Sequence, residues 1–203
     1  MIEPKHFSSA AKPKGTSDKT LEIHRDKLYL GYVKKYNEIS EKLHEYSQGK
    51  KDLTAVGSPT YSELRGLKEG ETFAANGVYL HEWYFSVLGG NGEPKGALAD
   101  ALKERYGSIE NFLGYFKANG MVARGWAVLA WDTRRGALKV YTADAHNQGG
   151  VWGCLPILVL DVYEHAYFAD YGADRSRYID DYLAALDWGA ANGFYEKASK
   201  VVL

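Results

Sequence analysis

The chain has 203 residues, of which 45% are hydrophobic and 14% aromatic, a composition typical of a globular protein and not of a disordered one. Its formal net charge of −1 at pH 7 argues against a nucleic-acid partner bound across the surface. The single cysteine, Cys154, excludes an internal disulfide and sites built on several thiolates. No apolar run approaches the ~20 residues of a membrane span, and the N-terminus lacks a signal-peptide core, so we expect a cytoplasmic protein with no membrane partner.

The first ninety residues are predicted to form an antiparallel helical hairpin. An irregular arm over residues 1–17 ends in capping residues, and a helical pattern then runs from 19 to about 46, with one face made by Leu21, His24, Leu28 and Tyr32. Residues 49–59 break this pattern. A second helix is predicted from about 71 to 88, with His81 on its apolar stripe, and a glycine-rich segment ends it.

The remaining residues mix helices and strands, which gives an α+β fold class. Two helices are predicted at 94–106 and 108–119. Residues 126–131 and 137–142 form a strand hairpin around a Thr-Arg-Arg-Gly turn, and an apolar run at 155–161 is a third strand. Closing helices are predicted at 162–170, 176–187 and 189–198.

Four side chains of the predicted interior suggest a metal site. Asp161 ends the third strand and His165 follows four residues later, a spacing that lets both point the same way. His24 and His81 lie on the inward stripes of two helices that pack together. Taken singly, each histidine is more often a hydrogen-bonded core residue, so the hypothesis depends on the group. Three imidazoles and one carboxylate suit a first-row metal ion.

These residues resemble the iron/manganese superoxide dismutases. The run Asp161-Val162-Tyr163-Glu164-His165-Ala166-Tyr167 is similar to that family's Asp-x-Trp-Glu-His-Ala-Tyr signature, with tyrosine for tryptophan. Three further stretches match in the same order, namely Leu21-Glu22-Ile23-His24, Asn76-Gly77 with His81, and Gly125-Trp126-Ala127. Tyr178-Ile179 and Asp187-Trp188 also resemble the closing helices, so the similarity extends from about residue 19 to 190.

The resemblance implies a superoxide dismutase with one iron or manganese ion per subunit, bound by His24, His81, Asp161, His165 and a solvent molecule. It implies a helical hairpin domain (1–90) packed on an α/β domain (91–203) with a three-stranded antiparallel sheet. It also implies a homodimer or homotetramer with superoxide as the small anionic substrate. In the family, the glutamate equivalent to Glu164 reaches across the subunit boundary to the partner's ligand histidine.

Several further roles follow from the same resemblance. Tyr32 matches a tyrosine at the mouth of the active site that takes part in proton relay, and Tyr84, Phe85 and Trp126 are expected to wall the metal. Iron enzymes of the family often carry a glutamine at the position of Gly77 that holds the metal-bound solvent. Here that partner must come from the 145–150 loop, where we favour His146 and keep Gln148 as the alternative.

Two departures from the family occur at the expected substrate entrance. Leu28 stands for a usual histidine and Phe168 for a usual tyrosine, a pair that meets across the dimer, so we predict a more apolar gateway. An acid replaces one usual arginine after that helix, which leaves Lys27 and Arg175 to steer the anion. Because of these departures, one alternative to a superoxide dismutase is a paralogue of the family that lacks dismutase activity. A non-haem iron oxygenase is the other, although its site needs only two histidines.

Overall fold

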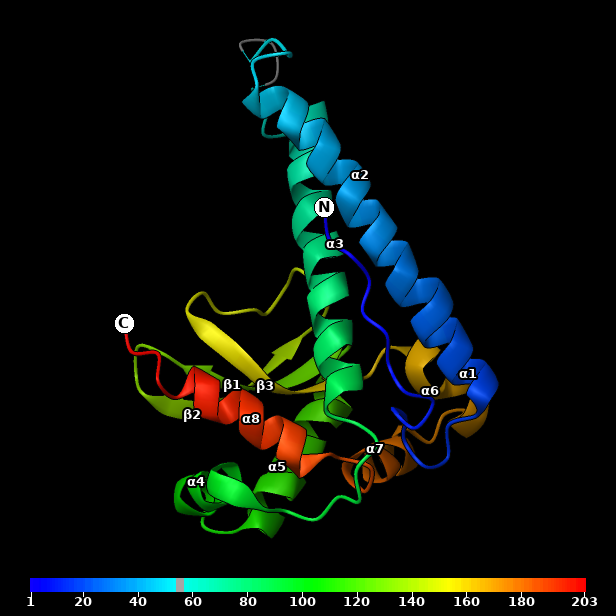
Figure 1. Cartoon of the computed structure of the whole chain (residues 1–203), viewed down its shortest axis with the longest axis vertical. Coiled ribbons are helices and arrows are strands. Elements are labelled where there is room, and N and C mark those ends of the chain that lie inside the picture. Colours follow the sequence, from blue (N-terminus) through cyan, green and yellow to red (C-terminus); the bar gives the residue numbers. More distant parts are fainter. Residues whose placement is uncertain (54–56) are drawn as a thin grey trace.

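The computed structural model describes residues 1–53 and 57–203. After the N-terminal arm, one long helix comprises α1 (Asp18–Glu22), a π-helical segment (Ile23–Tyr29) and α2 (Leu30–Ser47). Helix α3 (Glu63–Ser86) returns antiparallel to α2 and packs along it (Figure 1). The predicted helical hairpin is therefore confirmed.

The π-helical segment changes which side chains of the first helix are buried. A π-turn takes in one more residue than an α-turn. The buried side chain one turn after His24 is therefore Tyr29, while Leu28 is half-buried and lies outside the hydrophobic core. Tyr32 is half-buried and packs against the core. The predicted stripe is correct for Leu21 and His24 and wrong for Leu28.

Helix α3 begins at Glu63, eight residues before its predicted start. The Ser62 side chain caps it by accepting a hydrogen bond from the Arg65 amide. Glycines at 66 and 70 lower the helix propensity at the start of α3, which hides this part of the helix in the sequence. Packing of α3 on α2 compensates for the low propensity. At Gly70 an added Cβ would lie 3.1 Å from Ile39 Cδ1, so the two helices approach closely there.

The strands β1 (Trp126–Asp132), β2 (Ala137–Ala143) and β3 (Cys154–Asp161) form an antiparallel sheet in the order β2-β1-β3. The predicted three-stranded sheet is therefore confirmed among the described residues. Trp126 pairs with Ala143 on one side and with Asp161 on the other. Asp161 thus ends an edge strand beside a central-strand tryptophan.

Five helices complete the described part of the chain: α4 (Gly96–Tyr106), α5 (Ile109–Val122), α6 (Glu164–Tyr171), α7 (Arg175–Leu183) and α8 (Trp188–Ala198). Helix α6 begins two residues later than predicted, because Tyr163 is extended and serves as its N-cap. Helix α7 ends at Leu183, before the predicted 187, because Asp187 caps α8 instead.

The two halves of the chain meet where α3 packs on β3 and α1 packs on α6 (Figure 1). The core cluster continues through this contact, from Val78 in α3 to the buried β3 residues. None of the helices formed by residues 1–53 and 57–203 is both long and apolar enough to cross a membrane.

Candidate metal centre

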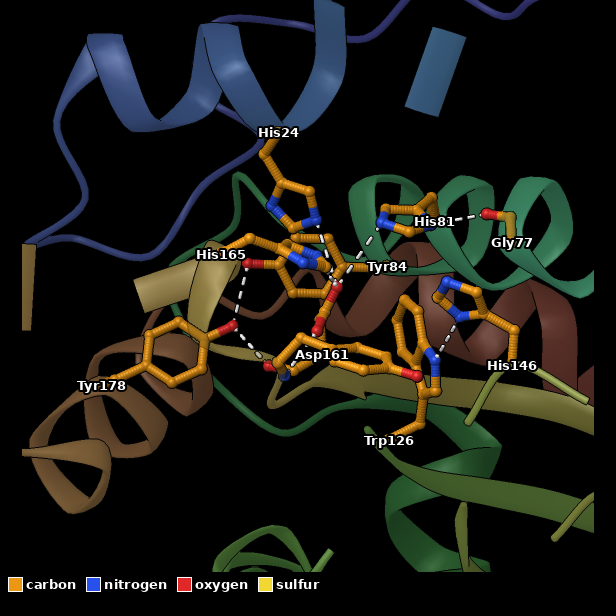
Figure 2. Close-up of polar contacts among 10 residues, drawn as sticks. His24, Gly77, His81, Tyr84, Trp126, His146, Asp161, His165 and Tyr178 are labelled. Carbon is orange, nitrogen blue, oxygen red and sulfur yellow. Dashed lines mark hydrogen bonds and ion pairs between the residues drawn. The ribbon is translucent and has the colours of Figure 1, made fainter. Parts of the chain in front are cut away.

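Four side chains from four elements converge where the hairpin meets the sheet (Figure 2). His24 comes from the π-helical segment, His81 from α3, Asp161 from the last position of β3 and His165 from the first turn of α6. The strand ends at Asp161, and the extended Tyr163 lets α6 start so that His165 turns back toward the carboxylate. The four-residue spacing thus spans a strand end and the turn after it.

The four ligating atoms lie within 4.8 Å of one another. The Nε2 atoms of His24 and His165 are each 3.1 Å from Asp161 Oδ2. His81 Nε2 is 3.5 Å from the same oxygen. Asp161 and His81 are fully buried, and His24 is 3% exposed. A cluster this polar and this enclosed is costly without a cation to pair it.

The ring of His81 shows that the residues fit a metal ion. Its Nδ1 lies 2.5 Å from the Gly77 carbonyl, which can only accept, so Nδ1 carries the proton. Nε2 of a neutral ring then presents a lone pair toward another acceptor, the Asp161 carboxylate. Among the described residues this buried nitrogen has no hydrogen-bond partner. A cation between the lone pair and the carboxylate satisfies both.

The low pKa values of two of the imidazoles favour metal binding, because a metal ion binds the lone pair of a neutral ring. Burial holds the pKa of His81 well below 6.5, and it also lowers the pKa of His24 against the opposing effect of Asp161. Burial alone would raise the pKa of Asp161, but His165 and His24 outweigh it and lower that pKa. At His165, burial alone would lower the pKa, but the charge and hydrogen bond of Asp161 outweigh burial, so the pKa is raised. Asp161 thus stabilises the protonated form of His165, and a proton on that ring competes with metal binding.

His146 lies beside the cluster and is 3% exposed. Trp126 Nε1 donates to its Nδ1 at 2.9 Å, and Asn76 Nδ2 donates to its carbonyl at 2.8 Å. Burial lowers the pKa of His146 to about 4, so the ring is neutral near pH 7. Because Nδ1 accepts, this hydrogen-bond pattern assigns the ring proton to Nε2. Gln148 is exposed, and its backbone amide bonds to Ala145.

Gly77 allows Tyr32 to approach the site. A Cβ at Gly77 would lie 2.7 Å from Tyr32 Cδ1, closer than a side chain tolerates. The Tyr32 ring centroid is 4.7 Å from that of His146 and 5.4 Å from that of His81. Burial, with a smaller effect of Asp161, raises the pKa of Tyr32 to about 12, so the phenol keeps its proton.

Three aromatic side chains enclose the cluster. The rings of Tyr84 and Phe85 have centroids 5.2 and 5.0 Å from that of His24. The Trp126 ring packs edge-on against His81 at 5.0 Å. All three are 2% exposed or less, so they keep bulk water from this side of the cluster.

Other predicted residues lie further out. Glu164 and Lys27 are exposed, and Phe168 is 51% exposed. Leu28 is half-buried. Arg175 is held by the protein: Nη1 donates to the Ala123 carbonyl at 2.9 Å and Nε to the Tyr167 hydroxyl at 3.1 Å.

Three residues without a role predicted from the sequence also support the site: Asn76, Tyr163 and Tyr178. The Tyr163 ring stacks on His165 at 5.3 Å and packs against His146 at 5.2 Å. Its position between Asp161 and His165 in the signature could have identified it. Asn76 and Tyr178 act through hydrogen bonds to main-chain carbonyls, for which the sequence carries no signal.

An α+β fold with three imidazoles, two of them buried and that of His165 half-buried, around one buried carboxylate defines a protein that can hold a single metal ion. Residues 94–193 match the family model described as "Iron/manganese superoxide dismutases, C-terminal domain". A superoxide dismutase [Fe] of Aquifex pyrophilus is 41% identical over 98% of this chain and 93% of its own length. A superoxide dismutase [Mn] 1 of Halobacterium salinarum is 33% identical over 91% of this chain and 88% of its own length. The chain belongs to the iron/manganese superoxide dismutase family.

Proposed function

We propose that His24, His81, Asp161 and His165 are the protein ligands of the one iron or manganese ion with which this superoxide dismutase works. The observation that carries the assignment is the His81 Nε2 lone pair, buried 3.5 Å from Asp161 Oδ2 with its tautomer fixed by Gly77. The relatives include both iron and manganese enzymes, and the donor set suits either ion.

When bound, the ion supplies one-electron redox chemistry that converts superoxide to dioxygen in one half-reaction and to hydrogen peroxide in the other. The protein's residues prepare the site for that chemistry. The carboxylate of Asp161 supplies negative charge that favours the trivalent ion, while neutral imidazoles keep the divalent ion accessible. The walls formed by Tyr84, Phe85 and Trp126 exclude water and strengthen the electrostatic interactions inside.

Tyr32 and His146 are proposed to supply and orient protons at the site. The peroxide half-reaction consumes protons, and both residues hold one near pH 7: Tyr32 on its hydroxyl and His146 on Nε2. Of the two loop candidates, the buried His146, fixed by Trp126, is favoured over the exposed Gln148 as the side chain that hydrogen-bonds the solvent ligand.

The quaternary structure is proposed to be a homodimer or homotetramer. Glu164 would bridge to a partner's His165, and Leu28 and Phe168 of opposite subunits would form an apolar entrance. The exposure of Glu164 and of half of Phe168, on the helix that carries His165, supports this arrangement. Lys27 is exposed and available to steer the anion, whereas Arg175 would act through its charge while bonded to Ala123.

Two further assignments remain proposals. The first is a domain boundary between residues 90 and 91. The domain of residues 1–90 would then supply His24 and His81, and that of residues 91–203 would supply Asp161 and His165, so that the ion is bound between the two domains. The protein is proposed to be cytoplasmic and to have neither a membrane nor a nucleic-acid partner.

Metal analysis and superoxide consumption, measured after reconstitution with iron and manganese separately, test the proposal. Wild-type protein is expected to hold one ion per subunit and to be active with at least one metal. His81→Ala and Asp161→Ala should lose both the ion and activity. His44→Ala, on the exposed far end of α2, is the matched control and should keep both. Full occupancy in His81→Ala would contradict the assignment.

A further inference from the structure

A buried tyrosine outside the metal cluster bonds to the main chain of Asp161. Tyr178 in α7 donates its hydroxyl proton to the Asp161 carbonyl at 2.7 Å. The hydroxyl of Tyr84 in α3 lies 3.1 Å from that of Tyr178 (Figure 2). A phenol has one proton to give, and that of Tyr178 goes to a carbonyl that can only accept, so Tyr84 donates to Tyr178. The hydrogen bonds therefore run in one direction, from α3 through α7 to the end of β3.

A second tyrosine of α7 makes an equivalent bond away from the metal cluster. β3 lies at the edge of the sheet, and the carbonyls of Val159 and Asp161, two residues apart, point to the same side. Tyr182, one helical turn after Tyr178, donates to the Val159 carbonyl at 2.8 Å. Helix α7 thus satisfies two successive carbonyls of the sheet edge with two hydroxyls. The two bonds are alike in chemistry and burial, but only one reaches a proposed metal ligand.

The peptide group that follows Asp161 is fixed from both ends. Its carbonyl accepts from Tyr178, and its amide, on Val162, donates to the Gly125 carbonyl at 2.8 Å. Fixing this plane fixes the rotation of the Asp161 backbone, and with it the direction in which the side chain leaves the strand. At the carboxylate, Oδ1 accepts from the Tyr163 amide at 2.9 Å, which leaves Oδ2 to face the imidazoles.

We propose that Tyr178, oriented by Tyr84, is a positioning residue of the metal centre, because its hydroxyl holds the Asp161 backbone so that Oδ2 faces the three imidazoles. The inference rests on the proposed ligand role of Asp161. Tyr178 acts only through that residue's main chain. Both residues are fully buried, so without the hydroxyl no bulk water replaces it and the carbonyl loses its partner.

Tyr178→Phe and Tyr182→Phe test this as a matched pair, in the 203-residue chain loaded with manganese or iron. Each removes one buried hydroxyl between α7 and β3 and keeps the ring, so both should lower the thermal midpoint of the metal-free protein, Tyr178→Phe by more because it also leaves the Tyr84 hydroxyl without its acceptor. Only Tyr178→Phe should raise the metal dissociation rate, by about tenfold, which is the usual lower range for residues that support a ligand. Only Tyr178→Phe should shift the visible absorption of the trivalent ion and its midpoint potential.

Tyr84→Phe is the second variant, and it serves if Tyr178→Phe does not fold. It leaves the Tyr178–Asp161 bond in place but removes the donor behind it. The absorption band of Tyr84→Phe should shift away from that of wild type, whereas the band of Tyr182→Phe should match wild type. Where Tyr178→Phe folds, the shift in Tyr84→Phe should have the same direction and be smaller.

The outcomes separate the inference from the proposal beneath it. If Asp161→Ala holds metal as tightly as wild type, the ligand assignment fails. If Asp161→Ala loses the metal, but Tyr178→Phe matches Tyr182→Phe in dissociation rate, absorption and potential, the positioning role alone is overturned. Equal dissociation rates for Tyr84→Phe and Tyr182→Phe, with identical spectra, would remove the role assigned to Tyr84.

Discussion

Replacing Gly77 with alanine should destabilise the protein, although alanine is the better helix former. In an open helical position the change from glycine gains about 0.5–1 kcal/mol. At Gly77 the new Cβ would lie 2.7 and 2.8 Å from Tyr32 Cδ1 and Cγ, which are ring atoms next to the backbone and not the far end of a flexible side chain. Overpacking of this kind costs about 1–3 kcal/mol. The expected net effect is a loss of roughly 0.5–2 kcal/mol.

Gly31→Ala is the matched control for Gly77→Ala. Gly31 is exposed in α2, and an added Cβ there meets no atom within 4 Å, so this variant should gain the helix propensity alone. Urea denaturation of both variants, metal-free under chelation, gives the two changes in the free energy of unfolding.

The same pair distinguishes packing from function. Gly77→Ala must displace the Tyr32 ring from His81 and His146, so its turnover should fall, whereas Gly31→Ala should keep wild-type turnover. In a Tyr32→Ala background the clash is absent, and Gly77→Ala should become stabilising. If Gly77→Ala stabilises the otherwise wild-type protein as much as Gly31→Ala does, the close approach of Tyr32 to α3 is refuted.

Three further predictions follow from the surroundings of the site. The folded protein keeps His146 neutral down to a pKa of about 4, whereas the unfolded chain takes up its proton near the ordinary histidine pKa of 6.5. Stability from this group is therefore complete above pH 6.5 and lost as the pH falls toward 4, by about 3 kcal/mol in the metal-free protein. His146→Gln should flatten that part of the pH profile in urea denaturation, and an unchanged slope would disprove the contribution. Trp126→Phe leaves His146 Nδ1 without its donor, which should cost about 1–3 kcal/mol and lower turnover, as denaturation and stopped-flow superoxide decay would show. Lys27→Gln should slow the reaction at low ionic strength and have less effect at high, and a wild-type rate independent of salt would count against steering.

The sequence predicted the parts of the fold that depend on pattern. The helical hairpin follows from apolar residues at helical spacing, and the three strands follow from short apolar runs between turn residues. The strand end at Asp161 and the stripes of two helices each place a polar residue facing inward, which suggests a metal site. That the four side chains meet at one point is implied by the resemblance to the family and not by the pattern. The four-residue spacing of Asp161 and His165 does not specify how the backbone turns between them. The extended conformation of Tyr163, the N-cap of α6, determines that turn.

The remaining differences arise from interactions that a linear pattern does not carry. An α-helical period predicts Leu28 on the buried face of the first helix. The π-helical turn at Ile23–Tyr29 adds a residue to that turn, so Tyr29 is buried instead. The first turns of α3 contain a Ser62 cap and a close approach of Gly70 to Ile39 of α2, and the pattern of apolar residues in the sequence shows neither. The hydrogen bonds from Asn76 and Tyr178 end on main-chain carbonyls, whose positions depend on the assembled fold.

Anomalous X-ray scattering at the iron and manganese absorption edges, from crystals of the reconstituted protein, tests the metal centre most directly. A single peak per subunit is expected, within bonding distance of Nε2 of His24, His81 and His165 and of one Asp161 carboxylate oxygen. A peak elsewhere, or an occupied site from which His81 Nε2 points away, would contradict the account.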